Sequence, residues 1–305
     1  MALNKEVWLN TIVEDFYPDN SFASKSVDDS VFVTNKKVHI PNAGSPSNVE
    51  TNRTKKPASV SQRTDNELTY DMDELTTDPI YIPNVDMVEL SYDKRNSILA
   101  NDRAQLQESA HVNLLGRWGD GVKKGHILLT TGTKQRDAHT SEKASGKRLS
   151  ICKNDVLKLM TAFDADNVPE TGRYLLLDAY MYADLLSDLS ESDKWMFQNS
   201  ANVQKGVLGN LYGFDIMKRS RVLRLNATGK AVLGWSEEDV AGEMAAALAW
   251  HEKSVSRAMG EVKIFDSTDN PLYYGDIYSF LMRTGGSARR YDGKGLYLLG
   301  EATVA

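Results

Sequence analysis

Residues 271–299 read PLYYGDIYSFLMRTGGSARRYDGKGLYLL, and this stretch decides the fold class that we expect. Its aromatic and aliphatic residues indicate two strands, separated by a basic segment that contains glycine. We expect Gly285 and Gly286 to form a positive-φ turn and residues 293–295 a second one, because glycine adopts that conformation without steric cost. The stretch is typical of a sheet edge that meets another chain, and nothing in it is typical of a catalytic pocket.

The composition is that of an ordinary soluble chain. Its 305 residues suffice for one large domain or two smaller ones. No apolar run reaches the roughly 18 to 20 residues of a membrane span, so we expect no membrane partner. The amino-terminal sequence lacks the basic and apolar regions of a signal peptide. Cys152 is the one cysteine, which leaves no internal disulfide and fits a reducing cytoplasm.

The charge argues against tight binding of nucleic acid. The net charge is −6, whereas a protein that grips phosphates is usually basic or carries a basic stripe. Residues 53–56 and 218–224 are mildly basic, and we interpret both as solvated. A container for packed DNA, however, does not need to bind its contents tightly.

The first 83 residues do not form the pattern of a compact domain. Residues 6–16 are predicted to form a short helix, and residues 31–34 and 38–41 a hairpin that residues 67–72 rejoin as a third strand. The polar stretch between them has little to bury, so it is either disordered or ordered by another subunit, and the flanking β patterns favour the second. Its candidate intersubunit contacts are the basic residues Arg53, Lys55, Lys56 and Arg63.

A long helix is predicted from Asn84 to about residue 115. Asn84 can cap its first turn, and Leu99, Leu106 and Ala110 recur at helical spacing. Gly116 is the expected stop. At 1.5 Å per residue, such a helix would be about 45 Å long, which suggests a structural spine.

From residue 125 onward the pattern is mixed α/β. Expected strands cover residues 126–130, 173–177, 211–217 and 221–223, and expected helices cover residues 154–163 and 178–189. A polar loop is expected at residues 135–147. Residues 237–259 are alanine-rich, and we predict a second long helix there, ended by Gly260. The final strands are expected to start at residues 262–265.

The motifs of common enzymes are missing. The sequence has no Gly-x-Ser-x-Gly nucleophile elbow and no phosphate-binding loop. His139 and Glu142 could place two metal ligands together, but no third partner is near in the sequence, which favours a solvated loop. His251 is interpreted as a hydrogen-bonded, partly buried histidine of the second long helix. We therefore expect no enzyme, no cofactor and no metal site, although catalytic groups can be scattered along a chain.

The order of these parts resembles the major capsid proteins of tailed bacteriophages, which have the HK97-like fold. The resemblance covers almost the whole chain and rests on the order of individually weak motifs, which are IYIP at 80–83, ELSYDKR at 89–95, VPETGRYLLL at 168–177, GNLYGFDI at 209–216, HEKSV at 251–255 and YGD at 274–276. It implies an α+β fold with an N-terminal arm (1–30), an extended β-hairpin loop (31–83), a peripheral domain with a spine helix (84–149), an axial domain (150–245) and a return to the peripheral domain (246–305).

The resemblance also implies a function. It implies a structural protein that self-assembles through pentamers and hexamers into an icosahedral phage head around double-stranded DNA, in the cytoplasm of a bacterial host. The implied partners are further copies of the chain, a separate scaffolding protein, a portal protein and DNA contacted without sequence preference. Gly285 and Gly286 join the candidate intersubunit contacts. An encapsulin-like compartment shell and a soluble α/β enzyme with scattered site residues are the alternatives.

Overall fold

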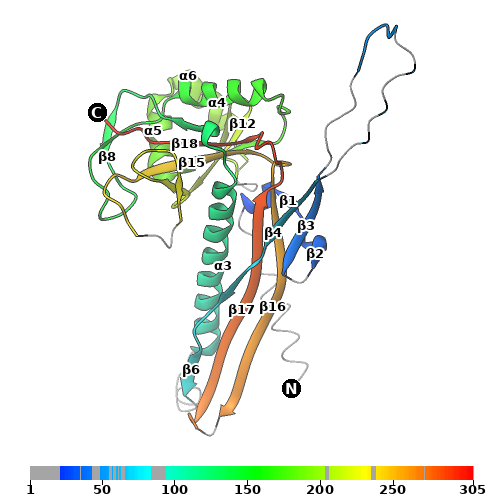
Figure 1. Ribbon diagram of the computed structural model, residues 1–305. Coiled ribbons are helices and arrows are strands. Elements are labelled where there is room, and N and C mark those ends of the chain that lie inside the picture. The colour runs from blue at the N-terminus through cyan, green and yellow to red at the C-terminus, as the bar shows by residue number, and fades with distance from the viewer. Residues whose placement is uncertain are drawn as a thin grey trace.

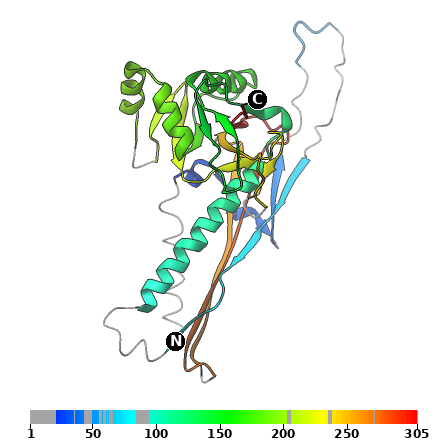
Figure 2. The same cartoon turned by 90° about the vertical axis from the view of Figure 1, so that its left-hand side faces the viewer.

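The computed structural model describes residues 21–34, 36–42, 49–54, 57, 60, 62, 66–83, 94–202, 206–234, 238–270 and 272–304. The helix expected at residues 6–16 lies outside these residues. In the described chain an upper body of sheet and helices sits on a long lower body (Figure 1). A view turned by 90° shows the same division (Figure 2).

The upper body is built on an eight-stranded sheet. Its central strand order is β11-β12-β10-β15-β13-β14, and β18 pairs with β15 and with β7. Every residue of β10 is buried, as expected for a strand covered on both faces. The strands are β7 (Ile127–Leu129), β10 (Arg173–Asp178), β11 (Gly209–Leu211), β12 (Phe214–Arg219), β13 (Leu223–Leu225), β14 (Val232–Leu233), β15 (Met244–His251) and β18 (Leu296–Gly300).

Three helices pack on this body, namely α4 (Lys153–Ala165), α5 (Ala179–Asp188) and α6 (Glu191–Asn199). Their starts follow from polar caps. The Asp178 carboxylate accepts a hydrogen bond from the Met181 N–H at the start of α5, and Ser190 with Asp193 forms a capping box at the start of α6. The apolar sides of the helices, including Val156, pack on strand residues of the sheet.

The lower body consists of one long helix and a five-stranded sheet, whose two longest strands, β16 (Val255–Asn270) and β17 (Gly275–Ala288), pair antiparallel and are called the ribbon below. The helix is α3 (Lys94–Asp120), about 40 Å long at its 27 residues. The sheet consists of β1 (Val27–Asp28), β16, β17, β5 (Asp73–Thr76) and β6 (Ile80–Pro83). Leu106 and Ala110 of α3 pack on apolar residues of these strands, so burial holds the helix against the ribbon.

Smaller elements surround the two bodies. A three-stranded sheet lies beside the ribbon in Figure 1, and it confirms the hairpin and the returning strand that the sequence predicted. The segment expected as a polar loop at residues 135–147 instead contains most of a strand pair. These elements are β2 (Val33–Thr34), β3 (Lys37–Asn42), β4 (Asn66–Asp71), β8 (Gln135–Asp137), β9 (Lys147–Leu149), and the short 3-10 helices η1 (Ala23–Lys25), η2 (Ser30–Phe32) and η3 (Lys124–His126).

The predicted second long helix is wrong, because its residues form β15 and the start of β16. Alternate residues of β15 face opposite sides of the sheet, and all of them are buried. Tertiary packing therefore overrides the helix propensity of alanine, since small side chains suit a strand covered on both faces. On one face of the sheet, the hydrophobic core includes Met244, Ala246, Leu248 and Trp250. On the opposite face, it includes Ala245, Ala247 and Ala249.

The predicted helix stop at Gly116 is also wrong, since α3 continues to Asp120. Leu114, Leu115 and Trp118 are buried at this end of the helix. Their burial offsets the roughly 1 kcal/mol that glycine costs inside a helix. The expected start at Asn84 lies outside the described residues.

The closing stretch is not one hairpin. β17 runs without a turn through Gly285 and Gly286, whose partners on β16 are Ala258 and Arg257. The positive-φ glycines are Gly293 and Gly295 instead, and they lead into β18 of the other sheet. The predicted turn at residues 285–286 is therefore wrong, and the predicted second turn is confirmed.

Candidate intersubunit surfaces

The basic candidate contacts are only partly described. Arg53 lies in the segment between β3 and β4, and its Nε is 3.3 Å from Glu50 Oε2. This ion pair is local and half-exposed, so it leaves Arg53 on the surface. Lys55, Lys56 and Arg63 lie outside the described residues.

Gly285 and Gly286 do not face a neighbouring subunit, because both are buried inside this one. A Cβ added to Gly286 would lie 2.3 Å from Leu114 Cδ1 and 3.1 Å from Trp118 Nε1. The glycine at 286 thus lets α3 approach β17 closely. Burial inside the subunit therefore contradicts the expected intersubunit contact at both glycines.

The far end of the β16–β17 ribbon carries exposed aromatic and aliphatic side chains. Leu272 and Tyr274 are 82% and 79% exposed. Tyr81 of β6 donates a hydrogen bond of 2.5 Å to the Tyr273 carbonyl, which fixes the shape of this tip. Apolar side chains gathered at one extremity are expected where another chain covers them. The sequence signal was present, since this tip belongs to the quoted stretch.

A second exposed apolar pair lies on α6 of the upper body. Trp195 is 70% exposed and Met196 is 68% exposed, while Phe197 beside them is buried in the core. Phe197 anchors the helix, so Trp195 and Met196 stand on a supported surface. The sequence does not predict this pair, because the order of residues does not show which side of a short helix remains uncovered.

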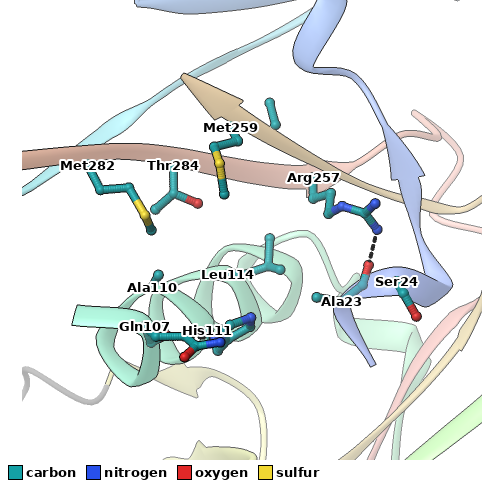
Figure 3. Close-up of a pocket in the computed structure, with 11 residues that line it drawn as sticks. Ala23, Ser24, Gln107, Ala110, His111, Leu114, Arg257, Met259, Met282 and Thr284 are labelled. Atoms are coloured by element: carbon teal, nitrogen blue, oxygen red, sulfur yellow. Dashed lines mark hydrogen bonds between the residues drawn. The ribbon is translucent and has the colours of Figure 1, made fainter. Parts of the chain in front are cut away.

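A small apolar pocket lies between α3, η1 and the ribbon (Figure 3). Its volume is about 60 Å³, well below the roughly 300 Å³ at which small-molecule sites begin. Arg257 donates a hydrogen bond to the Ala23 carbonyl at its edge. Burial lowers the pKa of His111 in its wall to about 4, so this imidazole is neutral near pH 7. The pocket is a small gap between packed elements.

Of the two histidines that the sequence analysis considered, His251 is buried and His139 is partly buried. His251 is buried at the end of β15, and the Lys253 N–H donates to its Nδ1 over 3.1 Å. That confirms the expected hydrogen-bonded histidine, although on a strand instead of a helix. His139 is not in a solvated loop, because Asp178 and Glu301 lie beside it. Both partners are far from His139 in the sequence, so spacing could not reveal them.

In the part of the chain that the structure describes, no helix is both long and apolar enough to cross a membrane. No family model and no curated protein sequence matches the chain. Many solved structures do match it at the level of the fold.

Phage capsids and a virus-like particle are among the matching structures. The capsid of Ralstonia phage GP4 is 11% identical with a TM-score of 0.65, over 92% of this chain and 88% of that chain. The capsid of cyanophage Pam1 is 12% identical with a TM-score of 0.62, over 94% and 93%. A virus-like particle from Pyrococcus furiosus is 10% identical with a TM-score of 0.57, over 97% and 99%. The chain therefore has the mixed α+β, HK97-like fold of phage capsid structures, as its sequence motifs predicted.

Proposed function

We propose that this chain is a major capsid protein that self-assembles through pentamers and hexamers into an icosahedral phage head around double-stranded DNA. The observation that carries the proposal is that nearly the whole chain matches nearly the whole of several phage capsid chains. An enzyme built on the same fold would need a site. The pocket beside α3, at about 60 Å³, is too small to hold a substrate of ordinary size. A larger hollow of about 480 Å³ lies beside Met72, Gly260 and Arg283, but it is wide open to solvent.

We assign the parts of the fold to the parts of a shell subunit. The sheet β2-β3-β4 forms the base of the extended loop expected at residues 31–83, and α3 is the spine helix. The upper body corresponds to the axial domain and the lower body to the peripheral domain. A boundary at residue 245 would cut β15, and β7 and β18 also belong to the upper sheet. We therefore widen the axial domain to residues 126–251 with residues 295–304.

The exposed tip and the exposed pair on α6 are the subunit contacts that we propose. They lie at the two ends of an elongated molecule (Figure 1), so each can meet a different neighbour. A single contact of this size is weak, but closed symmetry repeats it around every ring and links the rings to each other. Arg53, Lys55, Lys56 and Arg63 remain candidates for the reach of the extended loop.

The partners beyond the chain itself remain part of the proposal. A separate scaffolding protein, a portal protein and DNA contacted without sequence preference follow from a phage head assembled in a bacterial cytoplasm. The net charge of −6 is compatible with enclosing DNA without gripping it.

An encapsulin-like shell with protein cargo is the second candidate. The specific observation in its favour is the match to the virus-like particle, which covers 97% of this chain and 99% of that one. Genes for a portal and a packaging enzyme beside the gene of this chain would favour the phage head, whereas a cargo enzyme gene would favour the compartment.

Electron microscopy of the purified full-length chain, alone and with a scaffolding protein, tests the shell function. We expect capsomers or closed shells. Tyr274 has a φ of 54°, a conformation that Asn and Asp tolerate better than most residues. Tyr274→Asp should therefore keep the subunit folded and abolish assembly, while Tyr274→Phe, the matched control, assembles normally. A wild-type chain that remains monomeric under all of these conditions contradicts the proposal.

Limited proteolysis tests the role of the extended loop. If a neighbouring subunit orders this loop, the free subunit should be cut first between residues 42 and 63, and assembly should protect the same bonds. Equal cleavage rates before and after assembly would show that the loop does not reach a neighbour.

A further inference from the structure

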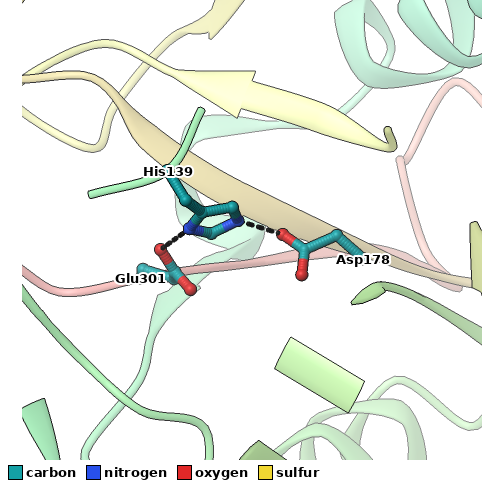
Figure 4. Close-up of side chains that lie close together, drawn as sticks. All are labelled: His139, Asp178 and Glu301. Carbon is teal, nitrogen blue, oxygen red and sulfur yellow. Dashed lines mark hydrogen bonds and ion pairs between the residues drawn. The ribbon is translucent and has the colours of Figure 1, made fainter. Parts of the chain in front are cut away.

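A buried polar cluster lies where three separate segments of the upper body meet (Figure 4). His139 comes from the connection between β8 and β9, Asp178 ends β10, and Glu301 follows β18. One nitrogen or oxygen atom of each side chain lies within 4.8 Å of the other two. The Glu301 side chain is 1% exposed, so its carboxylate depends on protein partners or a bound ion for compensation.

The hydrogen bonds assign the protons of His139. Its Nε2 is 2.9 Å from Asp178 Oδ2, and Asp178 Oδ1 accepts the Met181 N–H over 2.7 Å. A carboxylate that accepts on both oxygens is ionised, so Nε2 carries the proton that it donates to Asp178. In the neutral imidazole, Nδ1 is then left with an unshared electron pair.

The unshared electron pair of His139 Nδ1 lies near the Glu301 carboxylate, whose Oε2 also carries unshared pairs. His139 Nδ1 is 3.8 Å from Glu301 Oε2, too far for a hydrogen bond, and both atoms are buried without a hydrogen-bond partner in the described chain. A nitrogen bound to zinc at about 2.0 to 2.1 Å and an oxygen bound at about 2.0 to 2.2 Å lie about 3.3 to 3.7 Å apart, for angles from tetrahedral to trigonal. The separation of Nδ1 from Oε2 lies just above this range, so a small movement of either side chain would let both atoms bind one metal ion.

The surrounding charges leave room for a further cation. Arg136 NH1 is 3.2 Å from Asp184 Oδ2, and its NH2 contacts Glu301 Oε1. With His139 neutral, this one guanidinium faces three carboxylates, those of Asp178, Asp184 and Glu301. Lys134 lies at the exposed rim, where its Nζ donates to the side chain and carbonyl of Ser187. Its charge also acts on Asp184, so Arg136 and Lys134 together face the three carboxylates.

We propose that His139 Nδ1 and Glu301 Oε2 bind a divalent cation of the Zn²⁺ class, with water completing the coordination. Asp178 acts as a positioning residue that holds the imidazole through Nε2–H, the arrangement common around histidine ligands of zinc. The ion would tie the β8–β9 connection to the chain that leaves β18, and so raise the stability of the upper body.

Zinc titration of the untagged, full-length, unassembled chain tests this site after treatment with EDTA. Isothermal titration calorimetry at pH 7 should show one Zn²⁺ per chain, and zinc should raise the melting temperature. Asp178→Asn should weaken binding by about 10- to 100-fold, and His139→Gln and Glu301→Gln by at least as much. The matched control is His39→Gln, because His39 forms an exposed pair with Glu67 over 2.5 Å and should leave zinc affinity unchanged.

A measurement on the wild type guards against variants that fail to fold. X-ray absorption at the zinc edge should show nitrogen and oxygen atoms at about 2.0 to 2.2 Å with the signature of one imidazole. The absence of saturable zinc binding, equal affinity in folded His139→Gln, or a zinc spectrum without imidazole would each overturn the proposal. A protonated His139 between Asp178 and Glu301 would then supply the missing positive charge.

Discussion

Gly286→Ala tests how α3 sits on the ribbon. The added methyl carbon would lie 2.3 Å from Leu114 Cδ1 and 2.9 Å from the Ser256 carbonyl oxygen. Neither distance is tolerable for carbon, so the helix, the strand or the Leu114 side chain must shift. At Gly285 the same change is milder, since its nearest neighbours would be atoms of Met72 and Tyr70 at 3.3 Å. Gly285→Ala is therefore the matched control.

The expected magnitudes differ between the two sites. Overpacking a well-packed core costs about 1 to 3 kcal/mol, while replacing glycine by alanine stabilises by about 0.4 to 1 kcal/mol through the unfolded chain. Gly286→Ala should therefore lower the free energy of unfolding by about 1 to 2 kcal/mol. Gly285→Ala should stay within about 0.5 kcal/mol of wild type, because its contacts need only a small adjustment.

Urea unfolding of the unassembled subunit, followed by tryptophan fluorescence, measures both values. Leu114→Ala sharpens the test, because it removes the atom that the new methyl group meets. In that background, Gly286→Ala should cost less than it does alone, and the remaining cost comes from the contacts with the Ser256 carbonyl oxygen and Trp118 Nε1. A Gly286→Ala variant as stable as wild type, or a full cost that persists beside Leu114→Ala, would refute the close approach of α3 to β17.

Three further predictions concern buried or paired charges. Burial lowers the pKa of His111 to about 4 from an ordinary 6.5, so protonation favours the unfolded chain and stability falls as the pH drops from 6.5 to 4. In His111→Leu, the urea midpoint should depend less on pH over that range. An unchanged pH dependence would contradict the burial argument. Arg290 lowers the pKa of Asp292 to about 2 from 3.8, so this pair stabilises the fold above pH 3.8 and the effect is lost as the pH falls through 2. Asp292→Asn should remove a small part of the acid sensitivity seen by circular dichroism. Lys263→Gln, in an exposed pair with Glu261, serves as the control. Arg224 NH1 donates to Glu243 Oε2 over 3.0 Å, and both side chains are buried. Arg224→Met should lower the free energy of unfolding by about 3 to 5 kcal/mol, because it leaves a buried carboxylate without its charged partner. The double variant Arg224→Met with Glu243→Leu should recover much of that loss in the same urea assay.

Local patterns predicted those elements whose packing agrees with their propensity. The apolar run of β10 and the polar cap of α5 are examples, because burial and capping leave a direct trace in the sequence. β15 was mistaken for a helix because its alanines favour one in isolation. These residues form a strand because segments that are distant in the sequence cover both of its faces.

The sites show the same limit. The tip at Leu272 to Tyr274 lies in the stretch that the sequence predicted to be a sheet edge, but residues 272–274 form a turn before β17 and were not predicted as a contact. The His139 cluster was missed because Asp178 and Glu301 come from other strands, and only the register of the sheet brings them together. Gly286 was predicted to form a turn, but its lack of a side chain instead lets α3 lie close to β17.

The junction of the two bodies bears on how one chain could fill both pentamers and hexamers. Trp118 of α3 and Trp250 of β15 are fully buried, with ring centroids 5.7 Å apart. Each indole N–H donates over 2.8 Å, Trp118 to the Ser256 carbonyl and Trp250 to the Lys25 carbonyl. A close-packed contact with these bonds does not deform continuously. Under the proposed function, we therefore expect gradual adjustment between ring sizes to occur at surfaces outside this core, where the exposed side chains of the tip and of α6 lie.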